Sequence, residues 1–254
     1  MYFRAMLTKN VIKQVKSLQQ QKHRKELGLF VVEGRKMVEE LLLSDFRTES
    51  LFATEAFLAL NPNIEAEAVS EVQMQQMSGQ DTPPGILAVV HIPPAKPLSS
   101  DLPLTLALDR IANPGNMGTL IRTAEWFGLH DVVCSTDCVE LWNPKVIQAT
   151  MGSVFRMNVA YADLPSFLSS QKQSGKAVYG ALLEGENLFE MKEKPEGIIV
   201  IGSESHGIRS EALAHITRPV TIPRAGGSVT ESLNAAVAGG IILSHLARFS
   251  NRHP

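Results

Sequence analysis

Residues 113–124, NPGNMGTLIRTA, place asparagine and arginine side chains where an apolar run turns into a helical pattern. Asn116 can cap this predicted helix, and Arg122 lies outside its apolar stripe, free to face a ligand. A helix N-terminus at the carboxyl end of a parallel strand favours anions such as phosphate. The segment lacks the glycine spacing of a P-loop or a dinucleotide-binding loop. A ligand site and a capped structural helix fit it about equally well.

A carboxylate follows the apolar run GIIVIG at residues 197–202. The chain continues as SESHG, so that Glu204 lies in a polar turn between Gly202 and Gly207. This is an unusual place for an acid, because buried strands seldom end on charged groups. A hydrolase using Ser205 and His206 is a remote alternative, since Ser203 replaces the first glycine of the G-x-S-x-G nucleophile turn.

Two further polar residues, Ser232 and Asn234, lie where a glycine-rich loop meets the last predicted helix. Ser228 and Glu231 match the S/T-x-x-E capping box, which predicts that this helix begins near residue 231 and runs to about 249. The adjacent glycines at 239–240 predict close backbone packing, because glycine in a helix costs roughly 1 kcal/mol relative to alanine. Taken singly, such polar residues are more often caps than catalysts.

Together, the three segments resemble the SpoU/TrmH family of RNA 2′-O-ribose methyltransferases, within the SPOUT class. The first family motif is N-x-G-N-x-G-x-x-x-R-T-A, and it is matched by Asn113, Asn116 and Arg122. The second is an apolar strand followed by G-x-E-x-x-G, matched by Gly202, Glu204 and Gly207. The third is I-P…S-L-N…A, matched by Ile222, Pro223, Ser232, Leu233, Asn234 and Ala238. The resemblance covers residues 104–249, with a longer third-motif loop than the family usually has.

The resemblance implies methylation of a ribose 2′-hydroxyl in structured RNA, ribosomal RNA more than transfer RNA, with S-adenosylmethionine as cofactor. It implies that the catalytic residues are Arg122, Asn116, Glu204, Ser232 and Asn234. It also implies that the cofactor is bound largely by backbone groups near Gly202, Ile222 and Leu233. Because a guanidinium keeps its proton, we expect Arg122 to position a phosphate rather than act as a neutral base.

The family further implies a homodimer, with the active site near the subunit boundary and without a metal ion. The alternative function is that of a non-catalytic RNA-binding protein with a degenerate methyltransferase fold. Such a protein would have lost Arg122 or the asparagines of the motifs, and this chain retains Asn116 and Asn234.

Positive charge is concentrated at the start of the chain. Residues 1–36 contain nine of the 24 Lys and Arg residues but two of the 26 acids, which leaves the remainder at −9. Such an arm suits a phosphate backbone, although a solvated helix face would also explain it. The stretch KHRKELGLFVVEGRKMV resembles the substrate-binding domain that many such enzymes carry. This resemblance assigns RNA binding to Lys22, Arg24, Lys25 and Arg35.

Apolar runs alternate with helical patterns along the whole chain, which predicts an α/β fold. We expect a helix over 9–27 that ends at Gly28, within a small α/β domain over 1–92. Four prolines predict a linker over 93–103. Residues 104–254 are expected to form a mostly parallel sheet with helices on both faces, and the family resemblance adds a trefoil knot.

The composition is that of a globular protein. The chain is 44% hydrophobic and 20% charged, has no apolar run of the ~20 residues that span a bilayer, and starts without a secretory signal pattern. We therefore expect a soluble cytoplasmic protein. Cys134 and Cys138 fit buried thiols better than a disulfide or a zinc site.

Overall fold

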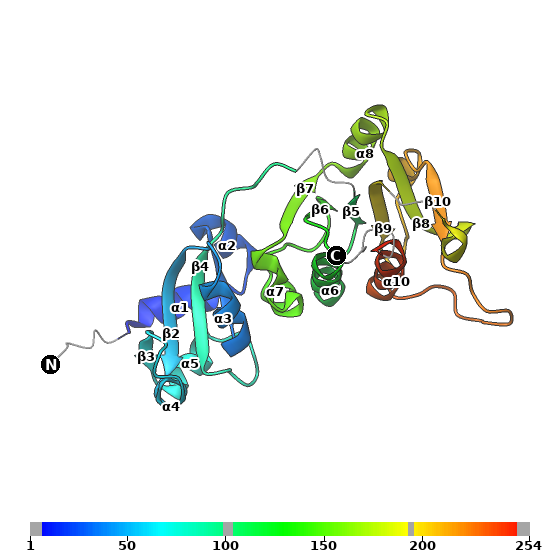
Figure 1. Cartoon of the computed structure of the whole chain (residues 1–254). Helices are drawn as coiled ribbons and strands as arrows, with labels where there is room; N and C mark the ends of the chain where they lie inside the picture. Colours follow the sequence, from blue (N-terminus) through cyan, green and yellow to red (C-terminus); the bar gives the residue numbers. More distant parts are fainter. Residues whose placement is uncertain (1–6, 99–103, 193–195, 248–254) are drawn as a thin grey trace, which may run out of the picture. The chain divides into compact units, whose positions relative to one another are not determined.

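The computed structural model describes residues 7–98, 104–192 and 196–247, and the chain divides into two compact units (Figure 1). The first unit comprises Met1–Pro94 and Glu140–Phe155, and the second comprises Ala95–Val139 and Arg156–Pro254. The sequence placed 140–155 with the C-terminal domain, whereas this segment clusters with the first unit. Residues 99–103 of the expected linker lie outside the described ranges. Within those ranges, no helix has both the length and the apolar character needed to cross a bilayer.

The first unit is built on a four-stranded mixed sheet of order β1-β4-β2-β3. Its strands are β1 (Leu29–Glu33), β2 (Thr48–Thr54), β3 (Glu67–Val69) and β4 (Ile86–His91). Its helices are α1 (Lys9–Ser17), α2 (Gln21–Leu27), α3 (Arg35–Leu42), α4 (Glu55–Leu60), α5 (Glu71–Met77) and α7 (Pro144–Thr150), and the short 3-10 helix η1 covers Ser153–Phe155. The single helix expected over 9–27 is divided into α1 and α2, and Gly28 ends α2 in the left-handed conformation, as predicted.

An aromatic cluster and a buried ion pair hold the 140–155 segment in the first unit. The Trp142 ring lies 4.6 Å from the Phe30 ring and 6.1 Å from the Phe46 ring, measured between centroids. The Arg24 guanidinium donates to Glu140 through Nε (3.2 Å) and to the Leu18 carbonyl through Nη1 (2.7 Å). The Arg24–Glu140 and Phe30–Trp142 contacts join residues more than 100 positions apart, so a sequence window could not have indicated them.

The second unit is a six-stranded sheet of order β10-β8-β9-β5-β6-β7, in which every pair is parallel. Its strands are β5 (Leu104–Asp109), β6 (Asp131–Ser135), β7 (Asn158–Ala162), β8 (Ala177–Asn187), β9 (Gly197–Gly202) and β10 (Arg218–Thr221). Its helices are α6 (Pro114–Trp126), α8 (Leu164–Gln173), α9 (Ser210–Leu213) and α10 (Ala235–Ala247), with the 3-10 helix η2 at Leu188–Glu190. Neither β7 nor α8 was predicted from the sequence, because the edge strand β7 is short and only partly buried and α8 is rich in serine and glutamine.

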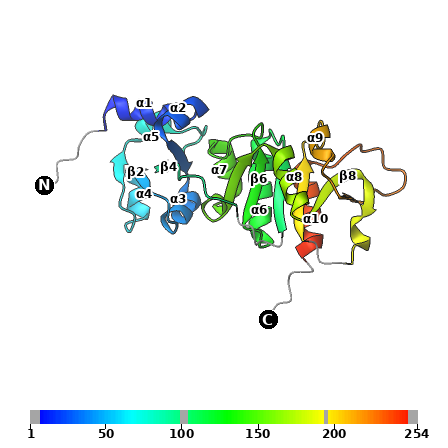
Figure 2. The same cartoon turned by 90° about the horizontal axis from the view of Figure 1, so that it is seen from above.

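Helices cover both faces of this sheet, as expected for parallel strands. Leu164 and Leu168 of α8 pack with Ala107 and Val133 on one face. On the other face, α10 packs against α6 and β9 (Figure 2). The sequence prediction of a mostly parallel α/β unit is therefore confirmed.

The two glycines of α10 differ in what surrounds them. A Cβ at Gly239 would lie 2.3 Å from Leu120 Cδ2, whereas nothing lies within 4 Å of a Cβ at Gly240. We expect Gly239→Ala to destabilise the protein by about 1–3 kcal/mol through overpacking. Gly240→Ala should stabilise it by up to about 1 kcal/mol, because alanine favours the helix. Urea unfolding of both variants measures the difference, and equal effects would contradict the packing at Gly239.

Candidate functional site

The candidate site lies at the carboxyl ends of β5 and β9, the two strands in the middle of the sheet of the second unit. Asp109 and Gly202 are the last residues of these strands and face each other in register. The chain progresses from β5 to β6 and β7 on one side, and then returns to β8 and β9 on the other. Open parallel sheets bind ligands where the strand order reverses in this way.

The turn after β9 is shaped by two glycines. Ser203 and Gly207 exchange backbone hydrogen bonds of 3.2 and 2.8 Å, which close the turn over Glu204. A Cβ at Gly202 would lie 2.2 Å from the Gly207 carbonyl carbon, and Gly207 has a φ of +61°. Both positions therefore require glycine, which is the physical basis of the G-x-E-x-x-G spacing.

The caps of α6 and α10 differ from those expected. Asn113, and not Asn116, caps α6: its Oδ1 accepts from the backbone N–H groups of Gly115 (2.8 Å) and Asn116 (3.1 Å). Asn234 caps α10 and accepts from the two N–H groups at 236 and 237. The prediction that Ser228 and Glu231 start the last helix is thus wrong, since α10 begins four residues after Glu231. Residues 248–249 of the expected helix lie outside the described ranges.

One residue from each motif meets at the carboxylate of Glu204. Its Oε1 accepts hydrogen bonds from Asn116 Nδ2 (2.9 Å), from Asn234 Nδ2 and from the backbone N–H of Ala235 (3.3 Å). Asn234 Nδ2 also lies 3.1 Å from Asn116 Oδ1. Because Asn113 supplies the cap of α6, the Asn116 side chain is free for this cluster. The N-terminus of α10 further stabilises the negative charge of Glu204.

A cavity of about 390 Å³ opens beside this cluster, within the size range of small-molecule sites. Its lining includes Arg110, Asn113, Asn116, Asp137, Ser203, Glu204, Ser205, His206 and Ala235. The cavity therefore combines carboxylates, amides and one arginine at the strand ends, a polar composition suited to orienting a ligand.

Other predicted site residues do not line this cavity. Arg122 is exposed on α6, six residues after Asn116 and so roughly 240° around the helix axis. Ser232 is exposed in the loop before α10. The cavity lining also leaves out Gly202, Ile222 and Leu233, although Gly202 directly precedes the lining residue Ser203. Asn234 is also absent from the lining, although it binds Glu204. The catalytic and cofactor roles of all these residues, and those of Asn116 and Glu204, stay predictions.

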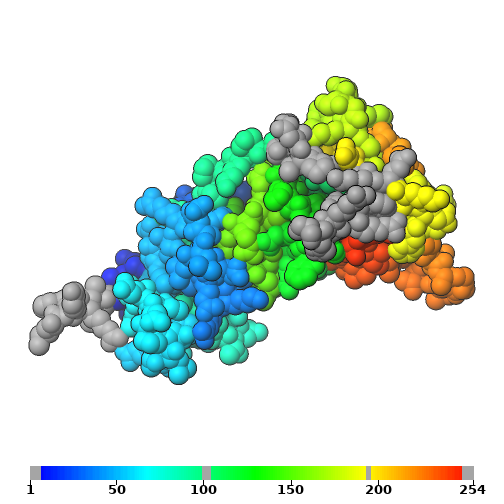
Figure 3. Space-filling view, in the orientation of Figure 1, coloured from blue at the N-terminus to red at the C-terminus, as the bar shows by residue number. Residues whose placement is uncertain are grey.

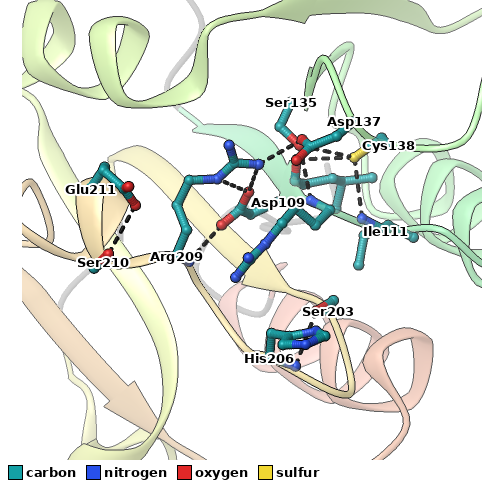
Figure 4. Close-up of polar contacts among 12 residues, drawn as sticks. Asp109, Ile111, Ser135, Asp137, Cys138, Ser203, His206, Arg209, Ser210 and Glu211 are labelled. Atoms are coloured by element: carbon teal, nitrogen blue, oxygen red, sulfur yellow. Dashed lines mark hydrogen bonds and ion pairs between the residues drawn. The ribbon is translucent and has the colours of Figure 1, made fainter.

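An ion-pair network joins the end of the turn that contains Glu204 to the sheet (Figure 4). It was not predicted from the sequence. Asp109 is fully buried, and it accepts 2.7 Å hydrogen bonds from the backbone N–H and from Nε of Arg209. Arg209 Nη2 also donates to Asp137 at 2.6 Å. The hydrogen bond to Asp109 raises the pKa of Arg209, so this link stays charged. An acid at the end of the apolar run LTLALD was a usable signal for Asp109, whereas nothing local indicated Arg209.

The two cysteines are buried thiols, as the sequence predicted. Burial raises the pKa of Cys134. A hydrogen bond with Cys134, helped by others from Ser135 and the Ile111 N–H, lowers the pKa of Cys138 to about 7 despite its burial. Among the described residues, no group of three or more His, Cys, Asp or Glu side chains is arranged to hold a metal ion.

Ser205 and His206, the basis of the hydrolase alternative, are hydrogen-bonded through Oγ and Nδ1 at 2.7 Å. A serine hydrolase also needs an acid that orients the histidine. In the part of the chain that the structure describes, no carboxylate is hydrogen-bonded to the His206 ring. The geometry gives this alternative no support beyond the pair itself.

The four residues assigned to RNA binding differ in exposure. Lys22, Lys25 and Arg35 are exposed, and Arg35 Nε lies 2.7 Å from Glu39. The side chain of Arg24 is only 2% exposed, and its guanidinium is occupied by Glu140 and the Leu18 carbonyl. The structure therefore does not support the assignment of Arg24 to RNA binding, because its charge is paired inside the first unit.

Comparison with known families identifies the second unit. The model of the SpoU rRNA Methylase family matches residues 103–244, more than half of the chain. The chain belongs to the SpoU rRNA methylase family. A second model, the MRM3-like substrate binding domain, matches residues 9–88 of this family member. Both resemblances found in the sequence are confirmed.

Relatives of known sequence and structure cover nearly the whole SpoU-family chain. The 23S rRNA (guanosine(2553)-2′-O)-methyltransferase RlmP of Bacillus subtilis is 31% identical, over 92% of this chain and 95% of that protein. A TrmH-family RNA methyltransferase structure from Porphyromonas gingivalis is 38% identical, with a TM-score of 0.85 over 96% of this chain and 99% of that one. The AdoMet-bound rRNA methyltransferase from Sinorhizobium meliloti is 28% identical, with a TM-score of 0.81 over 95% of both chains.

Proposed function

We propose that this protein transfers a methyl group from S-adenosylmethionine to a ribose 2′-hydroxyl of ribosomal RNA. The observation that carries the proposal is the meeting of Asn116, Glu204 and Asn234 beside a cavity at the strand ends. Relatives named as rRNA methyltransferases across nearly the full length support it. A degenerate RNA-binding protein should have lost Arg122 or the asparagines at 116 and 234, and this chain retains all three.

The residues at the cavity fit the cofactor. Its sulfonium is a cation, and the carboxylates of Glu204 and Asp137 both line the cavity. The loop from Ile222 to Asn234, orange in Figure 3, ends at the lining residue Ala235 and exposes the apolar side chains of Val229 (94%) and Leu233 (44%). These groups can cover the adenosine part, in keeping with the cofactor roles proposed for Ile222, Leu233 and the backbone at Gly202. When bound, the cofactor supplies an electrophilic methyl group.

The protein side chains would orient the reacting hydroxyl. Asn116 and Asn234 hold Glu204 in one position, and a fixed carboxylate can accept a hydrogen bond from the ribose. Ser232, next to this cluster in sequence, would add a further polar contact. Arg122 would hold an RNA phosphate, since its exposed guanidinium suits bidentate phosphate binding and cannot act as a neutral base.

A homodimer would bring Arg122 to such a position at the subunit boundary. An apolar surface formed by α10 and η2 supports this assembly: Val237 of α10 is 50% exposed and Phe189 of η2 is 52% exposed, and both line a hollow of about 470 Å³. Trp126 of α6 is 82% exposed, and α6 packs against α10. In this proposal, the first unit contacts the RNA through Lys22, Lys25 and Arg35, and the second unit carries out methyl transfer. The trefoil knot and the cytoplasmic location are part of the same proposal.

Calorimetric titration with S-adenosylmethionine tests the cofactor site. We expect micromolar binding by the native protein and at least about tenfold weaker binding by Asn234→Ala, which removes the α10 cap and a donor to Glu204. Gln173→Ala, an exposed change on α8 outside the cavity, serves as the control. If the folded native protein binds no cofactor, with or without rRNA, the non-catalytic RNA-binding alternative replaces the proposal.

A further inference from the structure

Arg110 has an unusual backbone conformation for an arginine. It directly follows Asp109 at the end of β5 and has a φ of +57°, in the left-handed region. Gly, Asn and Asp occupy this region most readily, so an arginine here is held under strain. Strain of this kind persists where the surrounding structure imposes it, and it is concentrated at functional sites. The backbone N–H of Arg110 is fixed by a 2.9 Å hydrogen bond to Ser135 Oγ.

The side chain of Arg110 lacks the partners that its neighbour Arg209 has. Arg209 is bound by Asp109 and Asp137. By contrast, Arg110 forms no ion pair among the described residues, and its buried Nε has no hydrogen-bond partner there. A buried donor without an acceptor costs free energy, so such a group calls for an explanation such as a missing ligand. Within the described ranges, Arg110 therefore has a positive charge without an ion-pair partner and an Nε–H donor without an acceptor.

The position of Arg110 indicates where a ligand would meet it. Arg110 lines the same cavity as Asn116, Glu204 and His206. Its charge also reaches the exposed Glu211 of α9: hydrogen bonds from its own backbone and Ser210 lower the pKa of Glu211 most, and Arg209 and Arg110 lower it further. Arg110 therefore lies at the cavity of the candidate site, where a bound substrate can reach it.

We propose that Arg110 binds a backbone phosphate of the RNA next to the ribose that is methylated. The inference rests on the proposed RNA methylation and adds a substrate-positioning residue to it. Each ribose in RNA is flanked by phosphodiesters, and a guanidinium binds them through paired charge-assisted hydrogen bonds. Asp109 and Asp137 already neutralise Arg209, whereas the charge of Arg110 stays available to the substrate.

The variant Arg110→Asn tests the proposal without adding strain, because asparagine accepts a positive φ. The probe is an unmethylated 23S rRNA transcript, bound over a series of salt concentrations. We expect affinity for the transcript to fall about tenfold or more at low salt, and the slope of log K against log salt to decrease by about one. Arg110→Lys should fall in between, since it keeps the charge but loses the paired geometry. Binding of S-adenosylmethionine should change less than about twofold.

Lys172→Gln is the matched control, because it removes one exposed positive charge from the same unit outside the cavity. Unchanged RNA affinity and salt slope in Arg110→Asn would overturn the proposal. So would an equal loss in Lys172→Gln, or weaker cofactor binding with normal RNA binding, which would assign Arg110 to the cofactor carboxylate. A native protein that binds no cofactor would overturn the methylation proposal, while a changed RNA affinity and slope would still support the phosphate contact.

Discussion

Replacing Glu204 with glutamine is expected to lower methyl transfer by about 10²-fold or more while leaving the fold intact. Glu204 Oε1 is the acceptor for Asn116, Asn234 and the Ala235 N–H. Glutamine keeps the shape but removes the charge that strengthens these bonds, each worth about 1.5–3 kcal/mol. Loss of geometry at a reacting centre can itself cost about 10²-fold in rate. Single-turnover transfer of a labelled methyl group to unmethylated rRNA measures the effect.

The matched control for this prediction is Glu211→Gln, which neutralises an exposed acid of α9 that does not line the cavity. It should retain near-native turnover. If Glu204→Gln also turned over at the native rate while binding the cofactor normally, the Asn116–Glu204–Asn234 cluster would not be the centre of the reaction.

Replacing Arg24 with methionine is expected to destabilise the first unit by about 3–5 kcal/mol. This effect would be unexpected from the sequence, in which Arg24 belongs to a basic run typical of a solvent-exposed helix face. The substitution leaves Glu140, whose side chain is 13% exposed, without its ion-pair partner. Fluorescence of Trp142 during urea unfolding follows this unit, because the Trp142 ring packs on Phe30. A Trp126→Phe background removes the signal of the second tryptophan, which is 82% exposed.

Lys25→Met is the control for Arg24→Met, since Lys25 is the exposed neighbour and its loss should change stability by less than about 0.5 kcal/mol. The double variant Arg24→Met with Glu140→Met should recover part of the lost stability, because no unpaired charge then remains. If Arg24→Met unfolded like the native protein but bound RNA much more weakly, Arg24 would be an RNA contact after all.

Local patterns in the sequence determined much of this protein. The apolar runs within 104–109, 131–135 and 197–202 form buried strands of the parallel sheet, because the middle of a strand covered on both faces is mostly apolar. The glycines around Glu204 indicated a tight turn, and the order of the three motifs indicated the family. These features depend on neighbouring residues, so a single sequence is enough to find them.

Only the tertiary structure decided which polar side chains cap, pair or face the cavity. Asn116 was expected to cap α6, but Asn113 does so, and the Asn116 side chain binds Glu204, which lies 88 residues further along the chain. Arg24 was expected at the surface, but Glu140, 116 residues away, holds it inside. For each Asn, Arg and Glu side chain, the sequence alone allows several possible hydrogen-bond or ion-pair partners. Long-range packing decides which of these partners a side chain binds. It removes some charged groups from water in ion pairs and leaves others, such as Arg110, without an ion-pair partner among the described residues.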